Sequence, residues 1–176
     1  LLVFGRGYSY GAEFFLKRRV GAVNGWLGYT LAKTERVFES INNGDPFPAR
    51  WDRRHDISFV MNYELNKRVD FGFVFVYGTG NAITLPIERY VYEGQIISRY
   101  GDRNSFRMAP YHRADISCNV KGKEKFVERI NKTTGEKEKR IRKFRGSWNF
   151  SIYNLYNRKN PYFIYFGNDL NEAGVL

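Results

Sequence analysis

A histidine and an aspartate stand side by side in the stretch ARWDRRHDISFVMNYEL, and this pair is the first place to look for chemistry. His55 and Asp56 have the residue types of a general base and the acid that orients it, as in enzymes that activate a serine or cysteine. No serine or cysteine in a nucleophile context accompanies them, and neighbouring residues of a strand point to opposite faces of a sheet. The pair therefore does not predict a catalytic site.

Two other kinds of chemistry, metal binding and phosphate binding, lack their usual sequence patterns. The chain contains two histidines and one cysteine, Cys118, and the histidines do not have the spacing of a metal site. The Gly-rich stretches GRGYSYG and YGTGN precede no predicted helix, so neither is expected to bind a phosphate. We therefore expect a protein that is not an enzyme and that holds no metal or cofactor.

Charged residues gather instead where two predicted strands begin. The stretches RRHDIS and YHRADIS, at 53–58 and 111–117, resemble each other, and each follows a long connection. The period of a strand places both aspartates on the polar face, with arginines close by. We expect an ion-paired cluster that fixes the register of the strands at one rim of a sheet, with direct ligand contact as the alternative. This rim cluster consists of Arg53, Arg54, Asp56, Arg113 and Asp115.

The elements that must position these residues show a period of two throughout. Apolar residues alternate with polar or small ones over segments of about ten residues, and no stretch has the period of a helix. The sequence therefore predicts an all-β, antiparallel fold with about seven strands. The predicted strands cover 8–17, 23–31, 56–65, 69–78, 112–121, 148–153 and a last segment near 162–167.

The composition limits the solvents that the two faces can meet. Aromatic residues make up 18% of the chain, yet its mean hydropathy is −0.53, and it has no apolar run of about 18 residues, which excludes transmembrane helices. A soluble sandwich and a membrane barrel both fit this composition. The long strands, and polar faces rich in Gly, Ser, Asn and Asp, favour the barrel. Under this interpretation the residues expected to face lipid are Phe14, Leu31, Phe59, Phe73, Ile116 and Phe150.

The predicted connections alternate between short and long, as they do in outer-membrane barrels. Segments 34–54 and 79–110 are long, and we expect them outside the cell, opposite the short periplasmic turns. Ligand contacts would lie in these two outer segments. The candidate ligand-binding residues within them are Tyr90, Tyr92 and Arg99.

Segment 122–146 breaks this alternation, because it is long where a short periplasmic turn is expected. Positions 121–145 contain 11 Lys and Arg against 4 Asp and Glu. The sequence predicts a basic hairpin that extends into the periplasm. It is either a solvated charged hairpin or one that contacts lipid phosphates or an acidic partner.

Four stretches of the chain resemble, in order, the C-terminal half of the barrel of TonB-dependent outer-membrane receptors. They are GYSYGAEFFLKRRVGAVNGWLGYTLAKTER, FPARWDRRHDISFVMNYEL, RNSFRMAPYHRADISCNV and SWNFSIYNLYNRKNPYFIYF. The chain is most similar to the Bacteroidetes-type receptors, which often begin with a carboxypeptidase-like regulatory domain. It departs from them in the basic hairpin and at Ala109, where a second proline is expected.

The resemblance implies an antiparallel transmembrane β-barrel segment, about seven strands of a larger barrel of about 22 strands. In such receptors an N-terminal domain plugs the barrel and TonB supplies the energy. Residues 1–176 would form a partial barrel with the hairpin 122–146 within it. The plug domain, the TonB box and the closing strand would lie outside this chain.

The same resemblance implies uptake of a nutrient or a metal chelate across the bacterial outer membrane. The implied partners are outer-membrane lipid, TonB through the N-terminal part, and a surface lipoprotein or other envelope proteins. One alternative is a receptor-like barrel that acts as a structural or assembly scaffold. Another is a soluble basic β-domain that binds single-stranded nucleic acid through exposed aromatics. Under the receptor interpretation no nucleic-acid partner is expected.

Overall fold

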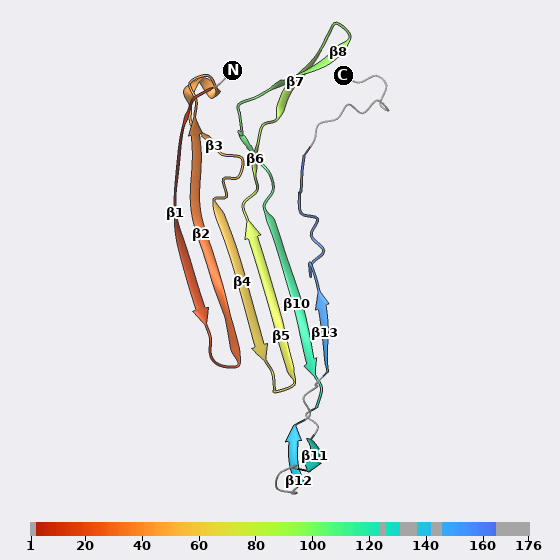
Figure 1. The fold of residues 1–176 in the computed structure, drawn as a ribbon. Coiled ribbons are helices and arrows are strands. Elements are labelled where there is room, and N and C mark those ends of the chain that lie inside the picture. The colour runs from red at the N-terminus through yellow and green to blue at the C-terminus, as the bar shows by residue number, and fades with distance from the viewer. Residues whose placement is uncertain (1–2, 124–125, 131–136, 142–145, 165–176) are drawn as a thin grey trace.

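The computed structural model describes residues 3–123, 126–130, 137–141 and 146–164, and they form an all-β fold. Its main element is a seven-stranded antiparallel sheet, which confirms the predicted fold class at this level (Figure 1). The strands follow the order β1-β2-β4-β5-β10-β13, and β3 pairs with β2. Their bounds are β1 Arg6–Arg18, β2 Val23–Val37, β3 Phe47–Pro48, β4 His55–Glu64, β5 Val69–Gly78, β10 Tyr111–Lys121 and β13 Ser147–Ile152.

Smaller elements lie outside this sheet. A short 3-10 helix, η1, covers Asn42–Gly44 in the connection from β2 to β4. The described residues contain no helix of the length and apolarity that a membrane span requires. Three further antiparallel pairs are β6 Ala82–Ile83 with β9 Phe106–Arg107, β7 Pro86–Tyr92 with β8 Gln95–Tyr100, and β11 Phe126–Ile130 with β12 Lys137–Ile141.

The last predicted strand is not formed where the structure can be compared with it. Residues 162–164 belong to no strand, and 165–167 lie outside the described residues. After β13 the chain leaves the ladder, and the side chain of Asn160 takes over the pairing of His112: its Oδ1 accepts from His112 N and its Nδ2 donates to His112 O, both at 3.0 Å. Pro161 follows directly, and a proline cannot donate to a ladder. The seventh strand of the sheet is β3 instead.

The register keeps each face of the sheet uniform across its strands. Residues that are direct cross-strand neighbours point to the same side, so the polar residues form one polar face and the apolar residues one apolar face. One row of the polar face runs Gly28, Ser58, Val76, Arg113. Two rows of the apolar face run Leu27, Phe59, Phe75, Ala114, and Met61, Phe73, Ile116, Ile152.

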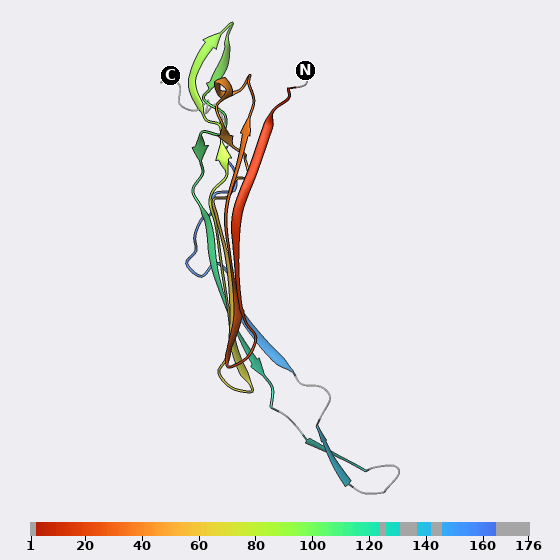
Figure 2. The same ribbon diagram turned by 90° about the vertical axis from the view of Figure 1, so that its left-hand side faces the viewer.

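The sheet is a single layer, and Figure 2 shows it almost edge-on with no second layer packed against it. Large apolar side chains are consequently open on the apolar face; Phe14 and Phe150 are each 62% exposed. A sheet is stable when its apolar face is covered by another layer or by an apolar solvent. The residues described here leave that face without such cover.

The two ends of the sheet differ in their connections (Figure 1). At one end, called the loop end below, the connections from β2 to β4 and from β5 to β10 fold over the strand ends. At the other, the turn end, β1 and β2 as well as β4 and β5 are joined by short turns, and the β11–β12 pair extends beyond it. Most of the buried residues lie at the loop end: Phe47, Ala49, Asp52, Ala82 and Met108.

Candidate functional site

The rim cluster predicted from the sequence forms two separate ion pairs at the loop end. Nη1 of Arg53 lies 3.2 Å from Oδ2 of Asp56, at the start of β4. Nη2 of Arg113 lies 3.0 Å from Oδ2 of Asp115, on β10. Strand β5 stands between β4 and β10, so the two pairs are not brought together. Arg54 belongs to neither of these two pairs, and its carbonyl oxygen accepts a hydrogen bond from Ala32 N at 3.1 Å.

The Arg113–Asp115 pair also ties β10 to the chain that follows β13. The backbone N–H of Asn154 donates to Oδ1 of Asp115 at 2.9 Å. The guanidinium of Arg113 lies 3.9 Å from the ring centroid of Tyr153 and donates to its hydroxyl. The carboxylate therefore serves two donors, and its contacts are those of a residue that holds strand register.

A third ion pair, between Asp52 and Arg107, is more buried than either and was not predicted from the sequence. Oδ2 of Asp52 lies 2.6 Å from Nη2 of Arg107, and Asp52 is only 4% exposed. Its Oδ1 accepts the backbone N–H of Thr34 at 2.6 Å. Thr34 lies past the part of β2 that pairs with β4, so the carboxylate of Asp52 supplies the acceptor for its N–H and completes the ladder of β2.

Arg107 extends the same network to the end of β5. Its Nη1 donates to the carbonyl oxygens of Asp52, at 2.6 Å, and Gly80, at 3.0 Å. The backbones approach closely here, since a Cβ added at Gly80 would lie 2.0 Å from the carbonyl oxygen of Met108. Arg107 thereby fastens the two long connections to each other at the loop end.

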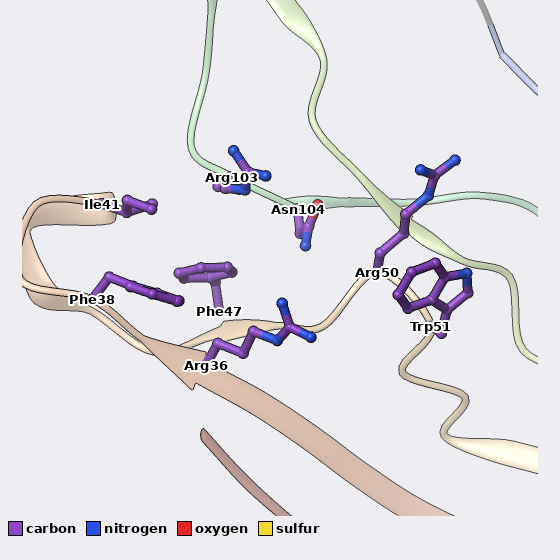
Figure 3. A pocket seen from close by; sticks show the side chains of 8 residues that line it. All are labelled: Arg36, Phe38, Ile41, Phe47, Arg50, Trp51, Arg103 and Asn104. Carbon is purple, nitrogen blue, oxygen red and sulfur yellow. The ribbon is translucent and has the colours of Figure 1, made fainter. Parts of the chain in front are cut away.

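Above this network the same connections enclose a hollow of about 360 Å³, called the loop-end pocket below. In Figure 3 Phe38, Ile41 and Phe47 lie on one side, Arg50 and Trp51 lie on the other, and Arg36 reaches up between them. Its lining residues are Arg36, Phe38, Ile41, Phe47, Arg50, Trp51, Arg103 and Asn104.

Hydrogen bonds hold the two connections that form the pocket. Oδ1 of Asn42 accepts from the backbone N–H of Arg103 at 2.7 Å, and Nδ2 of Asn42 donates to the carbonyl oxygen of Arg103 at 3.1 Å. Nδ2 of Asn104 donates to the carbonyl oxygen of Pro48 at 2.8 Å. These hydrogen bonds therefore fix the two segments that form the pocket relative to each other, although they are some sixty positions apart in the chain.

The ligand-binding residues proposed from the sequence do not line this pocket. Tyr90, Tyr92 and Arg99 belong to the β7–β8 hairpin, which projects beyond the loop end (Figure 1). Arg99 pairs with Glu88 at 2.9 Å, and it borders a second, more open hollow of about 600 Å³ together with Tyr100. Tyr90 and Tyr92 are each more than half exposed.

Sequence reasoning missed the pocket residues because their signal is spread over distant segments. Arg36, Arg50 and Trp51 stand near the predicted rim cluster, but Arg103 and Asn104 come from the next long connection. The run of aromatic and basic residues in ARWDRRHD was the one local signal. This run contains Arg50 and Trp51, which line the pocket, but the site residues predicted within it were Arg53, Arg54 and Asp56.

Comparisons with protein-family models, with curated protein sequences and with solved structures found no match to this chain. Among the described residues, no group of three or more His, Cys, Asp or Glu is arranged to hold a metal ion. What the loop end offers chemically is guanidinium groups beside aromatic rings, which suits the binding of anions.

Proposed function

We propose that this chain is part of the wall of a transmembrane β-barrel, the C-terminal part of a TonB-dependent receptor in a bacterial outer membrane. The receptor takes up a nutrient or a metal chelate. The observation that carries the proposal is the apolar face of the main sheet, which is continuous over β1, β2, β4, β5, β10 and β13 and is left open.

Lipid is the solvent that suits this face. In water an open band of Phe, Tyr, Leu and Ile would promote aggregation, whereas in a bilayer the same band is the lipid-facing surface of a barrel. The opposite face carries Asp56, Asp70, Arg113 and Asp115, which are easily accommodated in a water-filled lumen. Strands of 10 to 15 residues in β1, β2, β4, β5 and β10 are long enough to cross a membrane at a tilt.

The edges of the sheet support a larger assembly. Among the described residues, β1 and β13 each pair on one side only, so each leaves a row of unpaired backbone groups. Unpaired groups in lipid cost several kcal/mol each, and barrels avoid this cost by closure. In the receptor, further strands pair with both edges, and the complete wall comprises about 22 strands.

The experiment that tests this proposal uses the full-length protein that contains this chain, expressed in a Gram-negative host. Epitope tags are inserted near Gly94, in the β7–β8 hairpin, and near Gly135, which lies outside the described residues between β11 and β12. We expect the first tag to be detected on intact cells and the second only after permeabilisation. Recovery of the protein outside the outer membrane, or the reverse labelling, would overturn the proposal.

Transport and a scaffold role are separated by a second measurement. The purified C-terminal domain of TonB is tested for binding to the full-length protein in detergent. Saturable binding that depends on the receptor's N-terminal region is expected for a transporter. A correctly inserted barrel that does not bind TonB would instead support the structural or assembly scaffold.

A further inference from the structure

We infer that the loop-end pocket is a binding site for a small planar organic anion, an aromatic or conjugated carboxylate. The inference deepens the proposed function, on which it rests for the pocket's position at the outer end of the lumen. Binding itself is independent of transport and is measured without it.

The first argument is charge. The pocket is lined by Arg36, Arg50 and Arg103, and its lining includes no aspartate or glutamate. Other arginines at this end are neutralised, since Arg53 and Arg107, for example, each lie within 4 Å of a carboxylate. Within the part of the chain that the structure describes, none of the three pocket arginines has such an ion pair.

The three guanidinium groups consequently have no carboxylate within ion-pair distance among the described residues. Guanidinium groups bind carboxylates through parallel N–H donors, a geometry that a single ammonium group lacks. An anion in the pocket would supply the counter-charge. Exposure of the three side chains leaves them free to reach it.

The second argument is shape and apolar surface. Phe38 and Phe47 stack with centroids 6.1 Å apart and an interplanar angle of 26°, and Phe47 is only 4% exposed, so it forms a firm wall. Trp51 is 70% exposed, with the guanidinium of Arg50 over its ring at 5.9 Å from the centroid, so an indole ring and a cation stand together in contact with water beside the pocket. An aromatic ring that is open beside a wall of other rings offers a surface on which a planar ligand can stack.

The third argument is size and preorganisation. A hollow of about 360 Å³ is of the size that holds a small molecule, and it is too small for a folded protein partner. Its two halves are joined by the Asn42–Arg103 hydrogen bonds and rest on the Asp52–Arg107 pair. A ligand therefore does not have to order these loops when it binds, which favours affinity.

The pocket also opens on the side where a solute would pass. Arg36 is six positions after Thr30, and Thr30 is the cross-strand neighbour of Asp56 on the polar face. Residues an even number apart in a strand share a face, so Arg36 projects to the polar side of β2. In the proposed barrel this side is the lumen.

The experiment measures binding of 2-naphthoate to the full-length protein in detergent by titration calorimetry. Three probes of related chemistry are measured alongside: 2-naphthalenemethanol, which lacks the charge, cyclohexanecarboxylate, which lacks the planar ring, and inorganic phosphate. We expect saturable binding of 2-naphthoate at one site and at least about tenfold weaker binding of each other probe. Equal binding of 2-naphthoate and 2-naphthalenemethanol would overturn the inference.

Variants place the binding in the pocket. Arg36→Gln and Arg103→Gln are each expected to weaken 2-naphthoate binding about tenfold, which is typical for a lost charge-assisted hydrogen bond at a partly exposed site. Arg53→Gln is the matched control, because Arg53 lies at the same end but pairs with Asp56 outside the pocket; we expect less than about a twofold change. Equal losses in all three variants would assign the effect to overall charge and overturn the pocket.

The two proposals fail in different ways. Absence of saturable 2-naphthoate binding by a protein whose tags report the expected topology would overturn the pocket and leave the receptor standing. Pocket-dependent binding by a protein with the reverse topology would overturn the receptor and leave the pocket standing.

Discussion

At the loop end the long connections fold back over the strand ends and bury side chains between them, whereas at the turn end the strands meet in tight turns and stay exposed. Each end carries a carboxylate paired with a basic residue. Asp52 is buried and receives donors from Thr34 and Arg107. Asp70 lies 2.8 Å from Nζ of Lys121 and accepts from Nδ2 of Asn119, also at 2.8 Å, but Lys121 is close to half exposed.

This difference separates two uses of charge in one sheet. At the turn end, Lys121 is close to half exposed, so solvent screens its attraction to Asp70 and the pair adds less to stability. At the loop end, Asp52 is shielded from water, and loss of its carboxylate leaves the backbone N–H of Thr34 unpaired. The loop end is therefore where the described protein supplies its own packing, and the rest of the sheet depends on what surrounds it.

The largest effect that distinguishes the two ends is expected from their aspartates. In the full-length protein, Asp52→Ala should lower the free energy of unfolding by about 2 to 4 kcal/mol, because it removes the charge-assisted hydrogen bond from Arg107 and leaves the backbone N–H of Thr34 without its acceptor. Asp70→Ala should lower it by less than about 1 kcal/mol. Thermal melts in detergent measure both, and similar shifts for the two variants would contradict the contrast between the ends.

The conservative variant Asp52→Asn refines this test. Its amide oxygen can still accept the backbone N–H of Thr34, while the charge that faces Arg107 is lost. We therefore expect its melting temperature to lie between those of the wild type and Asp52→Ala. A melting temperature no higher than that of Asp52→Ala would mean that the charge opposite Arg107, and not the hydrogen bond from Thr34 that completes the β2 ladder, stabilises the site.

The next effect concerns the middle of the sheet, which neither end covers. Phe73→Arg places a charge on the apolar face, opposite Met61 and Ile116, at a cost of about 2 to 4 kcal/mol if that face meets lipid. Val74→Arg places it on the polar face, opposite Asp115. The amount of full-length protein in the outer membrane should fall sharply for the first variant alone, and equal tolerance would count against the lipid-facing assignment.

Glycine substitutions compare the backbone at the two ends. Gly80→Ala should destabilise the full-length protein by about 1 to 3 kcal/mol, since the added Cβ would lie 2.0 Å from the carbonyl oxygen of Met108. Gly146→Ala, next to β13 at the turn end, should change stability by no more than about 0.5 kcal/mol, because none of the described atoms lies within 4 Å of its added Cβ. Equal melting temperatures of the two variants would show that the loop end relaxes freely.

The strands and their faces could be predicted from the sequence because a period of two is a local property. The alternation of Phe71, Phe73 and Phe75 with Gly72 and Val74 fixes which face each residue takes, and the register keeps that assignment across neighbouring strands. The long connections could be predicted for the same reason, as gaps between alternating segments.

The contacts at the loop end could not be predicted in this way, because they join distant segments. Arg107 is 55 positions from Asp52, and the chain offers many other basic residues as partners. The strand predicted near 162–167 failed where it can be compared because Asn160 uses its side chain for pairing that a local pattern assigns to backbone. A side chain that pairs with a strand in place of backbone leaves no periodic signal in the sequence.

The smallest effect is expected from Arg53–Asp56, the more exposed of the two loop-end ion pairs that the sequence predicted. Side chains of Arg53 and Asp56 are 54% and 39% exposed, so solvent screens their attraction. Arg53→Ala, Asp56→Ala and the double variant form a double-mutant cycle, whose coupling energy should be below about 1 kcal/mol. Melts of the full-length protein at low and high salt measure it, with a smaller value expected at high salt. A coupling energy as large as the loss of stability in Asp52→Ala would show that this pair behaves like the buried Asp52–Arg107 network. The packed part of the loop end would then include the start of β4.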